Sequence, residues 1–232
     1  MQVPELLRVQ TPAGSVPAAC LDLSPRRIQA DTLPRMFTGI VTGIGRVATL
    51  ERRRGKATRV VVVPPRGYGA FRRGESISLS GVCVTATESG RRLVADLSPE
   101  TLAVTTLGAV EPDETVNLER ALEWRGRVSG HFVLGHVDAV AQVLEVEDLG
   151  GSWTYRFSIP RGFSPHVVRK GSLALDGVSL TVARRGARDF DVAVIPETYR
   201  RTTLGSRRAG DRVNFEVDPL SRYRAAARRT SR

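Results

Sequence analysis

The strongest constraint on the fold of this chain is an internal repeat. Three blocks recur in the same order and with a spacing of 96 or 97 residues: 39–41 with 135–137, 76–85 with 172–181, and 100–119 with 197–216. In the longest block nine of twenty positions are identical, and both copies end in Val-Asn-x-Glu. Stacked solenoid repeats have shorter periods, of about 20–50 residues. The chain is therefore expected to hold two homologous domains in tandem, over 36–122 and 126–220, which meet near Trp124–Gly126.

Within each copy the hydrophobic pattern predicts strands. Arg59–Val63 is rich in β-branched residues and stops at two prolines, while Ser76–Ser80 and Ser172–Asp176 alternate apolar and polar residues. Short runs of this kind, bounded by Gly, Pro and Asp, are typical of a β-sandwich or a β-barrel. Helices should be few and short, and the stretches after Arg66 and after Arg161 are the best candidates.

Composition excludes several classes of protein. The 232 residues are 41% hydrophobic, and they contain no run of about 18 apolar residues that would span a membrane. Two cysteines, Cys20 and Cys83, cannot build a disulfide scaffold, so a reducing, cytoplasmic location is expected. The net charge is +11, but five of these charges fall in the last twelve residues. Since only 6% of the residues are aromatic, the chain lacks the stacking platforms of a nucleic-acid surface, and no nucleic-acid partner is expected.

The two ends of the chain differ from its middle. Residues 1–35 hold five prolines and no sustained hydrophobic period, and they lack the basic start and apolar stretch of a secretory signal. They are expected to be a disordered extension or a start assigned too far upstream, with Met36 as the natural start; a transit peptide is the weaker alternative. Residues 221–232 are expected to form a short basic tail.

Two familiar cofactor patterns fit poorly. Gly43–Ala48 matches the dinucleotide fingerprint, but the Val60–Val63 strand follows where that fingerprint needs a helix and then an acidic residue. A glycine-rich strand end is expected instead. The three histidines and two cysteines show no metal-ligand spacing, so neither a metal nor a cofactor is expected.

Polar residues of the repeated blocks are the candidates for function. His131 and His136 lie five residues apart in a Gly-bounded strand, although each could be a hydrogen-bonded core histidine, and Cys83 could be a small buried hydrophobe. Four threonines could be ordinary strand residues: Thr85, Thr101, Thr181 and Thr198. Packing alone would preserve the apolar pattern, whereas these blocks also preserve Gly, Ser, Thr and Glu. We therefore expect two related sites for one kind of flat heteroaromatic molecule.

Five segments together resemble the riboflavin synthase alpha chain family. They are Met36–Val41, Gly81–Thr85, Gly130–Val137, Lys170–Thr181 and Ile195–Thr198. The Met-Phe-Thr-Gly-Ile-Val sequence is especially specific, and the resemblance spans 36–220. It implies an all-β chain of two tandem six-stranded Greek-key barrels with short helices, in which each barrel binds one 6,7-dimethyl-8-ribityllumazine.

The resemblance also implies an enzymatic activity and an assembly. One lumazine donates a four-carbon unit to another, which gives riboflavin and 5-amino-6-(D-ribitylamino)uracil in the last step of riboflavin biosynthesis, without a cofactor. A homotrimer is implied, in which the first barrel of one subunit meets the second barrel of the next. Association with lumazine synthase would be compatible with this role.

Site residues are assigned from the resemblance by motif. Lumazine contacts of the first barrel would be Gly39, Ile40, Val41, Cys83, Val84, Thr85, Asp96, Leu97, Ser98, Pro99, Glu100 and Thr101. Those of the second barrel would be Gly135, His136, Val137, Lys170, Ser179, Leu180, Thr181, Ala193, Val194, Ile195, Pro196, Glu197 and Thr198. Candidate catalytic residues would be Phe37, Thr38, Ser76, Cys83, His131, His136, Ser179, Thr181 and Asp218.

The chemistry suits these residue types. The C7 methyl of a lumazine is acidic because its carbanion delocalises into the pteridine, so His131 or His136 could move the proton near neutral pH. Cys83, Ser179 or water could add to the ring of the other lumazine. Holding the two rings face to face could lower the barrier by roughly 7–11 kcal/mol.

Two other functions remain as alternatives. A non-catalytic lumazine- or flavin-binding relative would keep the barrels but would tend to lose the Phe-Thr opening and the histidine pair, which are present here. A basic β-barrel that binds RNA would need aromatic platforms on one face, whereas the four tyrosines of this chain are scattered.

Overall fold

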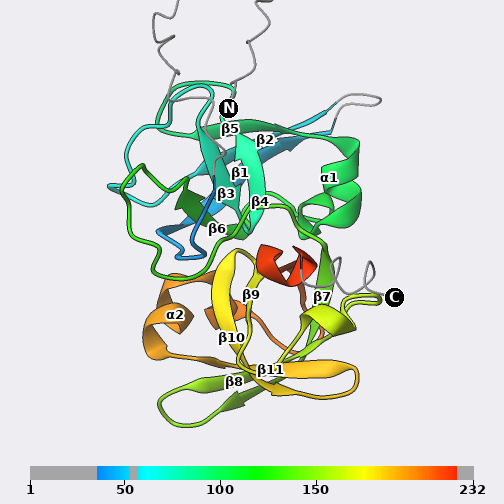
Figure 1. Ribbon diagram of the computed structural model, residues 1–232. Helices are drawn as coiled ribbons and strands as arrows, with labels where there is room; N and C mark the ends of the chain where they lie inside the picture. Colours follow the sequence, from blue (N-terminus) through cyan, green and yellow to red (C-terminus); the bar gives the residue numbers. More distant parts are fainter. Residues whose placement is uncertain (1–35, 53–56, 224–232) are drawn as a thin grey trace, which may run out of the picture. The chain divides into compact units, whose positions relative to one another are not determined.

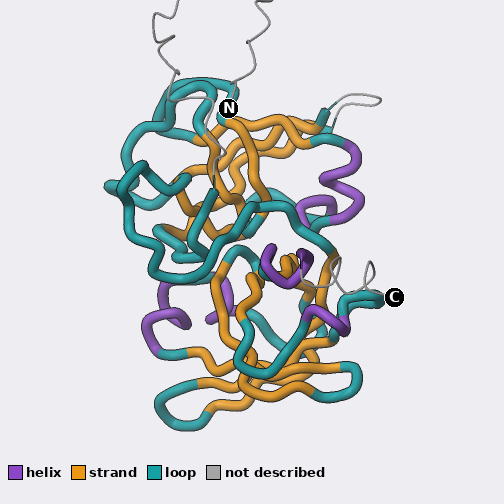
Figure 2. The backbone as a smooth tube through the Cα atoms, viewed as in Figure 1, coloured by secondary structure: helices purple, strands orange, loops and turns teal. Residues whose placement is uncertain are grey.

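The computed structural model describes residues 36–52 and 57–223. The predicted extension over 1–35 and most of the predicted basic tail lie outside these described residues. Within them, strands carry most of the regular structure and the helices are few and short (Figure 2). The all-β fold class is confirmed.

The first barrel is a six-stranded antiparallel sheet. Its strands are β1 (Gly43–Glu51), β2 (Thr58–Val63), β3 (Ser76–Leu79), β4 (Val82–Thr85), β5 (Leu93–Leu97) and β6 (Thr115–Arg120) (Figure 1). They are hydrogen-bonded in the order β4-β3-β6-β1-β2-β5. A bridge between Ala86, just after β4, and Ala95 of β5 nearly closes the barrel.

The second barrel repeats this arrangement. Its strands are β7 (Ala139–Asp148), β8 (Trp153–Ser158), β9 (Ser172–Leu175), β10 (Val178–Arg185), β11 (Asp189–Val194) and β12 (Arg212–Val217). The order β10-β11-β8-β7-β12-β9 is closed, and each strand takes the place of the strand six earlier. The prediction of two six-stranded barrels is thus confirmed.

Each barrel buries a hydrophobic core of its own. In the second barrel, Tyr155, Phe157 and Phe190 stack with successive ring centroids 6.0 and 5.7 Å apart. The buried Tyr155 hydroxyl donates to the Leu204 carbonyl at 2.7 Å, which satisfies the only polar atom of that side chain.

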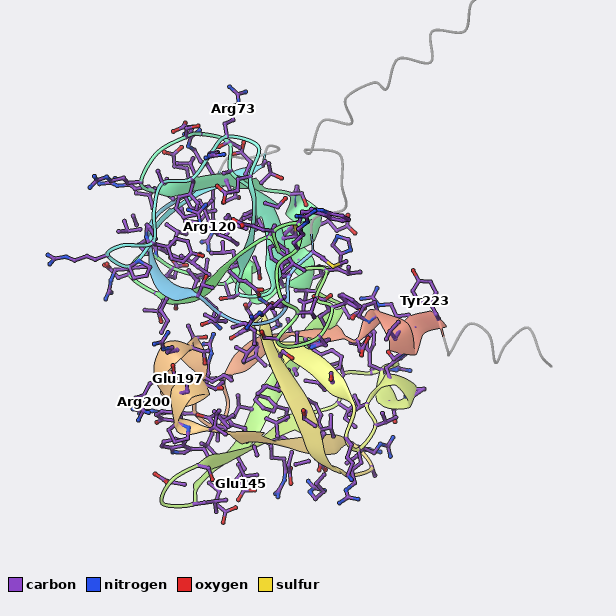
Figure 3. All side chains as sticks on the ribbon, turned by 60° about the vertical axis from the view of Figure 1, so that its left-hand side comes forward. Arg73, Arg120, Glu145, Glu197, Arg200 and Tyr223 are labelled. Carbon is purple, nitrogen blue, oxygen red and sulfur yellow. The ribbon has the colours of Figure 1, made fainter. Side chains whose placement is uncertain are left out.

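A surface arginine covers aromatic rings of the first barrel. The guanidinium of Arg120, which is labelled in Figure 3, lies over Tyr68 and Phe71, at 5.3 and 5.0 Å from the ring centroids, and pairs with Glu75. This cation–π contact leaves Arg120 at the end of β6 with its charge compensated and its stem packed.

The helices lie at repeat-equivalent positions. Helix α1 (Pro99–Val104) and helix α2 (Pro196–Arg201) each begin at a proline followed by a glutamate, and each leads into a 3-10 turn, η2 (Thr106–Gly108) or η4 (Thr203–Ser206). Proline suits the first helical turn because its missing N–H would have no intrahelical partner there. Both helices directly follow a strand, β5 or β11, and so belong to the repeated blocks.

Neither expected helix forms as such. After Arg66 the chain turns, because Gly67 and Gly69 adopt φ of +82° and +88°, outside the helical region. After Arg161 there is a single 3-10 turn, η3 (Ser164–His166). The prediction after Arg66 is therefore wrong, and the one after Arg161 is met by one short turn.

The glycine-rich stretch at Gly43–Ala48 lies in β1, as expected, and not in a nucleotide-binding turn. A Cβ atom on Gly45 would lie 2.7 Å from Val62 Cγ1 and 2.9 Å from Leu118 Cδ1. Glycine is needed here because side chains of the neighbouring strands pack across β1.

Candidate functional site

Two segments join the barrels directly. The first opening, residues 36–42, precedes β1, and the second opening, residues 131–138, precedes β7. The Phe37 N–H donates to the Val133 carbonyl at 2.7 Å, and the Val133 N–H donates back to the Phe37 carbonyl at 3.1 Å. Both side chains are fully buried and form a small cluster with Ala174. The openings therefore pair with each other at repeat-equivalent positions.

Beyond this pairing each opening reaches the other barrel. The Ser179 N–H on β10 donates to the Gly39 carbonyl at 2.8 Å, and the Cys83 N–H on β4 donates to the Gly135 carbonyl at 2.8 Å. A Cβ on Gly39 would lie 2.6 Å from Ser179 Cβ, and one on Gly135 would lie 2.7 Å from Cys83 Cβ. Each opening thus lies flush against a strand of the opposite barrel.

The apolar packing agrees with these hydrogen bonds. Val41 packs against the core of the second barrel, and Val137 packs against the core of the first. The openings are therefore exchanged: Gly39–Val41, expected at the lumazine site of the first barrel, lie against the second barrel, and Gly135–Val137, expected at that of the second, lie against the first. The repeat could not reveal this, since both copies carry the same glycine and valine.

The candidate first-barrel site comprises Cys83–Thr85 on β4, Asp96–Thr101 and Gly135–Val137. Ser76 on β3 lies directly opposite Thr85 in the sheet register. Residues Asp96–Thr101 run from β5 into α1, where the Ser98 side chain accepts from the Thr101 N–H at 3.0 Å. This cap fixes the turn between the strand and the helix.

The candidate second-barrel site comprises Ser179–Thr181 on β10, Ala193–Thr198 and Gly39–Val41. Its β10 residues pair with β9, while the pairing of β10 with β11 starts further along, at Val182 opposite Val192. The two strands therefore part beside Ser179–Thr181, as β4 and β5 do in the first barrel.

Two further residues assigned to the second-barrel site lie on the surface. Glu197, on α2, is exposed and forms an ion pair with Arg201. The neighbouring Arg200 is exposed as well (Figure 3). Lys170 is exposed and adopts φ of +64°, and its N–H donates to the Val182 carbonyl at 2.8 Å. Both can be reached from solvent.

A serine–histidine pair lies in the second-barrel site. Ser179 Oγ and His131 Nδ1 are 2.7 Å apart, and His131 is only 9% exposed. Burial lowers the pKa of His131 below its ordinary value, although the charge of Asp218 opposes this shift. The imidazole is therefore neutral at pH 7, and its Nδ1 can take the Ser179 proton. The structure thus brings the predicted residues Ser179 and His131 into contact.

The other predicted catalytic residues fall in different places. His136 is exposed in the second opening, next to Gly135, and so belongs to the side of Cys83. Phe37 is in the core between the barrels, and Thr38 is buried with its hydroxyl bonded to Glu119. Phe37 and Thr38 therefore make structural contacts that hold the first opening.

Two buried carboxyl groups were missed as candidates. Glu119 on β6 accepts from the Thr38 and Gly39 N–H groups, and Glu216 on β12 accepts from those of Leu134 and Gly135. Burial raises the pKa of both carboxyls, that of Glu216 to about 7. The signal in the sequence was the repeated Val-Asn-x-Glu, which places a glutamate at the same position of β6 and β12.

The asparagines of the same motif hold the barrels together. Asn117 Nδ2 donates to the Asp176 carbonyl at 2.9 Å, and its Oδ1 accepts from the Thr203 N–H at 2.8 Å. Asn214 makes the reciprocal pair, with the Ser80 carbonyl at 2.8 Å and the Thr106 N–H at 2.7 Å. Each asparagine thus satisfies backbone groups of the opposite barrel.

The part of the chain that the structure describes offers neither a metal centre nor a membrane-spanning helix. No group of His, Cys, Asp and Glu there is placed to hold a metal ion. None of the helices described is long and apolar enough to cross a membrane. Two cavities, of about 160 and 660 Å³, are lined by residues outside both sites, the larger by the stacked rings of Trp153 and Tyr199.

Comparison with known proteins agrees with the geometry. The model of the lumazine binding domain family matches this chain twice, over residues 38–121 and 134–218. The riboflavin synthase of Mycobacterium tuberculosis is 40% identical over 193 residues, which cover 81% of this chain and 96% of that relative. The riboflavin synthase of Brucella abortus is 37% identical over 198 residues, covering 82% and 96%, and that of Escherichia coli is 35% identical over 186 residues, covering 79% and 87%.

Solved structures share the fold. LumP in complex with riboflavin superposes with a TM-score of 0.71 and 21% identity, over 78% of this chain and 99% of that one. LumP in complex with 6,7-dimethyl-8-(1'-D-ribityl) lumazine gives a TM-score of 0.69 at the same identity and coverage.

Proposed function

This chain belongs to the riboflavin synthase family, and on that premise we propose how its two barrels share the reaction. As a riboflavin synthase it converts two molecules of 6,7-dimethyl-8-ribityllumazine into riboflavin and 5-amino-6-(D-ribitylamino)uracil. Four carbons pass from one lumazine to the other. The reaction therefore needs two bound lumazines of the same structure in unequal chemical roles.

Each barrel binds one lumazine, in a site completed by the opening of the other barrel. The first-barrel site takes its ligand between Cys83–Thr85 and Gly135–Val137, and the second-barrel site between Ser179–Thr181 and Gly39–Val41. Backbone contacts from Gly39 and Gly135 to the opposite strands support this grouping. Glycine allows the backbone to approach a flat ring closely.

The observation that carries this proposal is the chemical difference between two otherwise equivalent sites. The repeat places Cys83, a thiol, where the second barrel has Ser179, a hydroxyl with the buried His131 at hydrogen-bond distance. His136 lies beside the first-barrel site, exposed and able to reach a ligand. One site can therefore activate a hydroxyl, and the other can move a proton to or from a bound ring.

The roles follow from this difference. In the second-barrel site the Ser179 hydroxyl adds to C7 of its lumazine: the O–H proton passes to His131 Nδ1, a C–O bond forms, and the electron pair of the C7 double bond moves into the ring. In the first-barrel site His136 takes a proton from the C7 methyl, which leaves a carbanion stabilised by the pteridine. That carbon attacks C6 of the lumazine bonded to Ser179, so a C–C bond forms and the electron pair of the C6–N5 double bond moves to N5.

The two sites meet between subunits in this proposal. A homotrimer, in which the first barrel of one subunit faces the second barrel of the next, would bring the two lumazines together. The exposed side chains of Ile40 and His136, one from each opening, would lie at this contact. A cytoplasmic location fits the use of a cysteine in the site, and association with lumazine synthase would deliver the substrate.

The direct test is to mix the purified protein with 6,7-dimethyl-8-ribityllumazine alone. Riboflavin fluorescence should rise, with one riboflavin formed for every two lumazines consumed. Binding of the lumazine without riboflavin formation would show a non-catalytic lumazine- or flavin-binding protein and would overturn the assigned catalytic roles.

A further inference from the structure

Glu119 and Glu216 hold the two openings in place from within the barrels. Glu119 Oε1 accepts from the Thr38 N–H at 2.7 Å and from the Thr38 hydroxyl at 2.8 Å, and its Oε2 accepts from the Gly39 N–H at 3.1 Å. Glu216 Oε1 accepts from the Leu134 N–H at 2.8 Å, and its Oε2 from the Gly135 N–H at 3.1 Å. In both cases one carboxyl group takes two successive backbone donors.

These contacts fix the openings where they meet the ligand sites. Gly39 and Gly135 adopt φ of +76° and +75°, so each has a backbone geometry that other residues rarely adopt. The same two glycines present their carbonyls to Ser179 and Cys83 of the opposite barrels. The chain of contacts therefore runs from a carboxyl group, through one glycine, to the wall of the other barrel.

We propose that Glu119 and Glu216 are positioning residues that act across the exchange. Glu119, in the first barrel, sets the wall of the second-barrel ligand site, and Glu216, in the second barrel, sets the wall of the first-barrel ligand site. This inference rests on the proposed function for the identity of the ligand, but not for the contacts themselves.

The surroundings show why a carboxyl group is needed. Glu119 and Glu216 are 5% and 2% exposed, and a glutamine would offer a single acceptor oxygen and turn its NH₂ group toward the second backbone donor. One buried N–H would then lose its partner in each opening. Leu134 replaces Thr38 in the second opening, so Glu216 has no hydroxyl donor there and should tolerate substitution less well.

A matched pair of reporters can separate this role from general stability. In the first, Cys20→Ser leaves Cys83 as the reporter thiol of the first-barrel site. In the second, Cys20→Ser, Cys83→Ser and Ser179→Cys move the thiol to the equivalent position of the second-barrel site. Glu119→Gln and Glu216→Gln are then made in each background, and thiol alkylation by iodoacetamide is timed at pH 8.

The expected result is reciprocal. Glu216→Gln should accelerate alkylation of Cys83 roughly tenfold, because losing a hydrogen bond to a buried group loosens the segment over it, and should leave the thiol at Ser179→Cys unchanged. Glu119→Gln should do the reverse. Lumazine binding should weaken at the same site as the faster alkylation. Equal acceleration of both thiols by either variant, or of neither, would overturn the proposal.

Two further measurements keep the proposal testable if a variant does not fold or if the protein makes no riboflavin. If either glutamine variant does not fold, amide hydrogen exchange of the unmodified protein decides: the N–H groups of Thr38, Gly39, Leu134 and Gly135 should be protected, and fast exchange would contradict the assigned contacts. If the unmodified protein makes no riboflavin, the proposed function fails, while the alkylation rates still decide the positioning roles.

Discussion

Phe37 and Val133 hold equivalent positions in the two repeats and are hydrogen-bonded to each other through both of their backbone N–H groups. This pairing creates a local two-fold relation at the junction of the barrels. Gly39 meets Ser179 as Gly135 meets Cys83. A substitution on one side of the junction therefore has a natural control at the equivalent residue on the other side.

Adding a methyl group to either opening should remove one ligand site. Gly135→Ala would place a Cβ 2.7 Å from Cys83 Cβ at a residue with φ of +75°, so the second opening must move away from the first barrel. We expect lost lumazine binding at the first-barrel site, measured by equilibrium titration. Gly39→Ala should do the same at the second-barrel site.

The matched control for these substitutions is Gly67→Ala. Gly67 has φ of +82° but no atom within 4 Å of an added Cβ, so this change carries only the backbone cost of about 1–2 kcal/mol. Its ligand binding should stay normal. Loss of binding in Gly67→Ala would mean that backbone strain anywhere in the barrel is enough.

The Ser179–His131 pair should act as one unit. Ser179→Ala and His131→Gln are each expected to lower kcat by roughly a hundredfold, and the double variant should be no slower than the worse single variant, because each change already removes the proton transfer. Steady-state riboflavin formation measures this. Multiplying effects in the double variant would show that the two residues act independently.

The pH dependence of kcat/KM is a second test of the Ser179–His131 pair. Because burial lowers the pKa of His131, the neutral imidazole should persist below its ordinary pKa of 6.5. The acidic limb of kcat/KM should therefore fall only below pH 6.5. An acidic limb centred above that value would contradict His131 as the base.

Mixed oligomers should distinguish the exchanged arrangement from the unexchanged one. Chains carrying Cys83→Ala and Ser179→Ala, each impaired alone, should recover activity when assembled together, since an intact first-barrel site can face an intact second-barrel site. Cys83→Ala with His136→Ala should not recover, because both residues belong to the first-barrel site. Recovery of activity in the second mixture would show that His136 belongs to the second-barrel site.

Stability should depend on pH through Glu216. Its pKa of about 7 in the folded protein exceeds the ordinary value of 4.5, so the folded state binds the proton more tightly. The stabilisation is complete below pH 4.5 and is lost as the pH rises through 7; it amounts to about 3 kcal/mol. Urea unfolding from pH 4 to 8 should show this loss, and Glu216→Gln should reduce the slope. The exposed Glu147→Gln should leave it unchanged.

The two barrels could be predicted from the sequence because the patterns that indicate strands occur in both copies of the repeat. The alternating residues of Ser76–Ser80 and of Ser172–Asp176 predicted strands, and the structure has them at β3 and β9. The helices were placed wrongly, although Ser98, Pro99 and Glu100 provide an N-cap, a first-turn proline and an acidic residue, all of which favour a helix start. The hydrophobic period of the sequence does not by itself reveal helices of only six residues.

The exchange of openings had no sequence signal. Gly39 and Gly135 follow from the repeat as residues of close approach, but equivalent segments fit equivalent surfaces, so either barrel could receive either one. The contacts of Gly39 with Ser179 and of Gly135 with Cys83, beyond the register of Phe37 with Val133, decide between them. The pairing of Ser179 with His131 depends on the same register, because His131 enters the second-barrel site from the strand beside Thr38.

The reciprocal asparagines bear on how the chain unfolds. Asn117 and Asn214 each satisfy a buried N–H and a carbonyl that belong to the other barrel, so a molecule with one barrel melted would leave those groups unpaired in the surviving one. Two cores of different composition would otherwise melt at separate temperatures. Here the loss of either core removes the support of the other, and calorimetry should show both heats within a single cooperative transition.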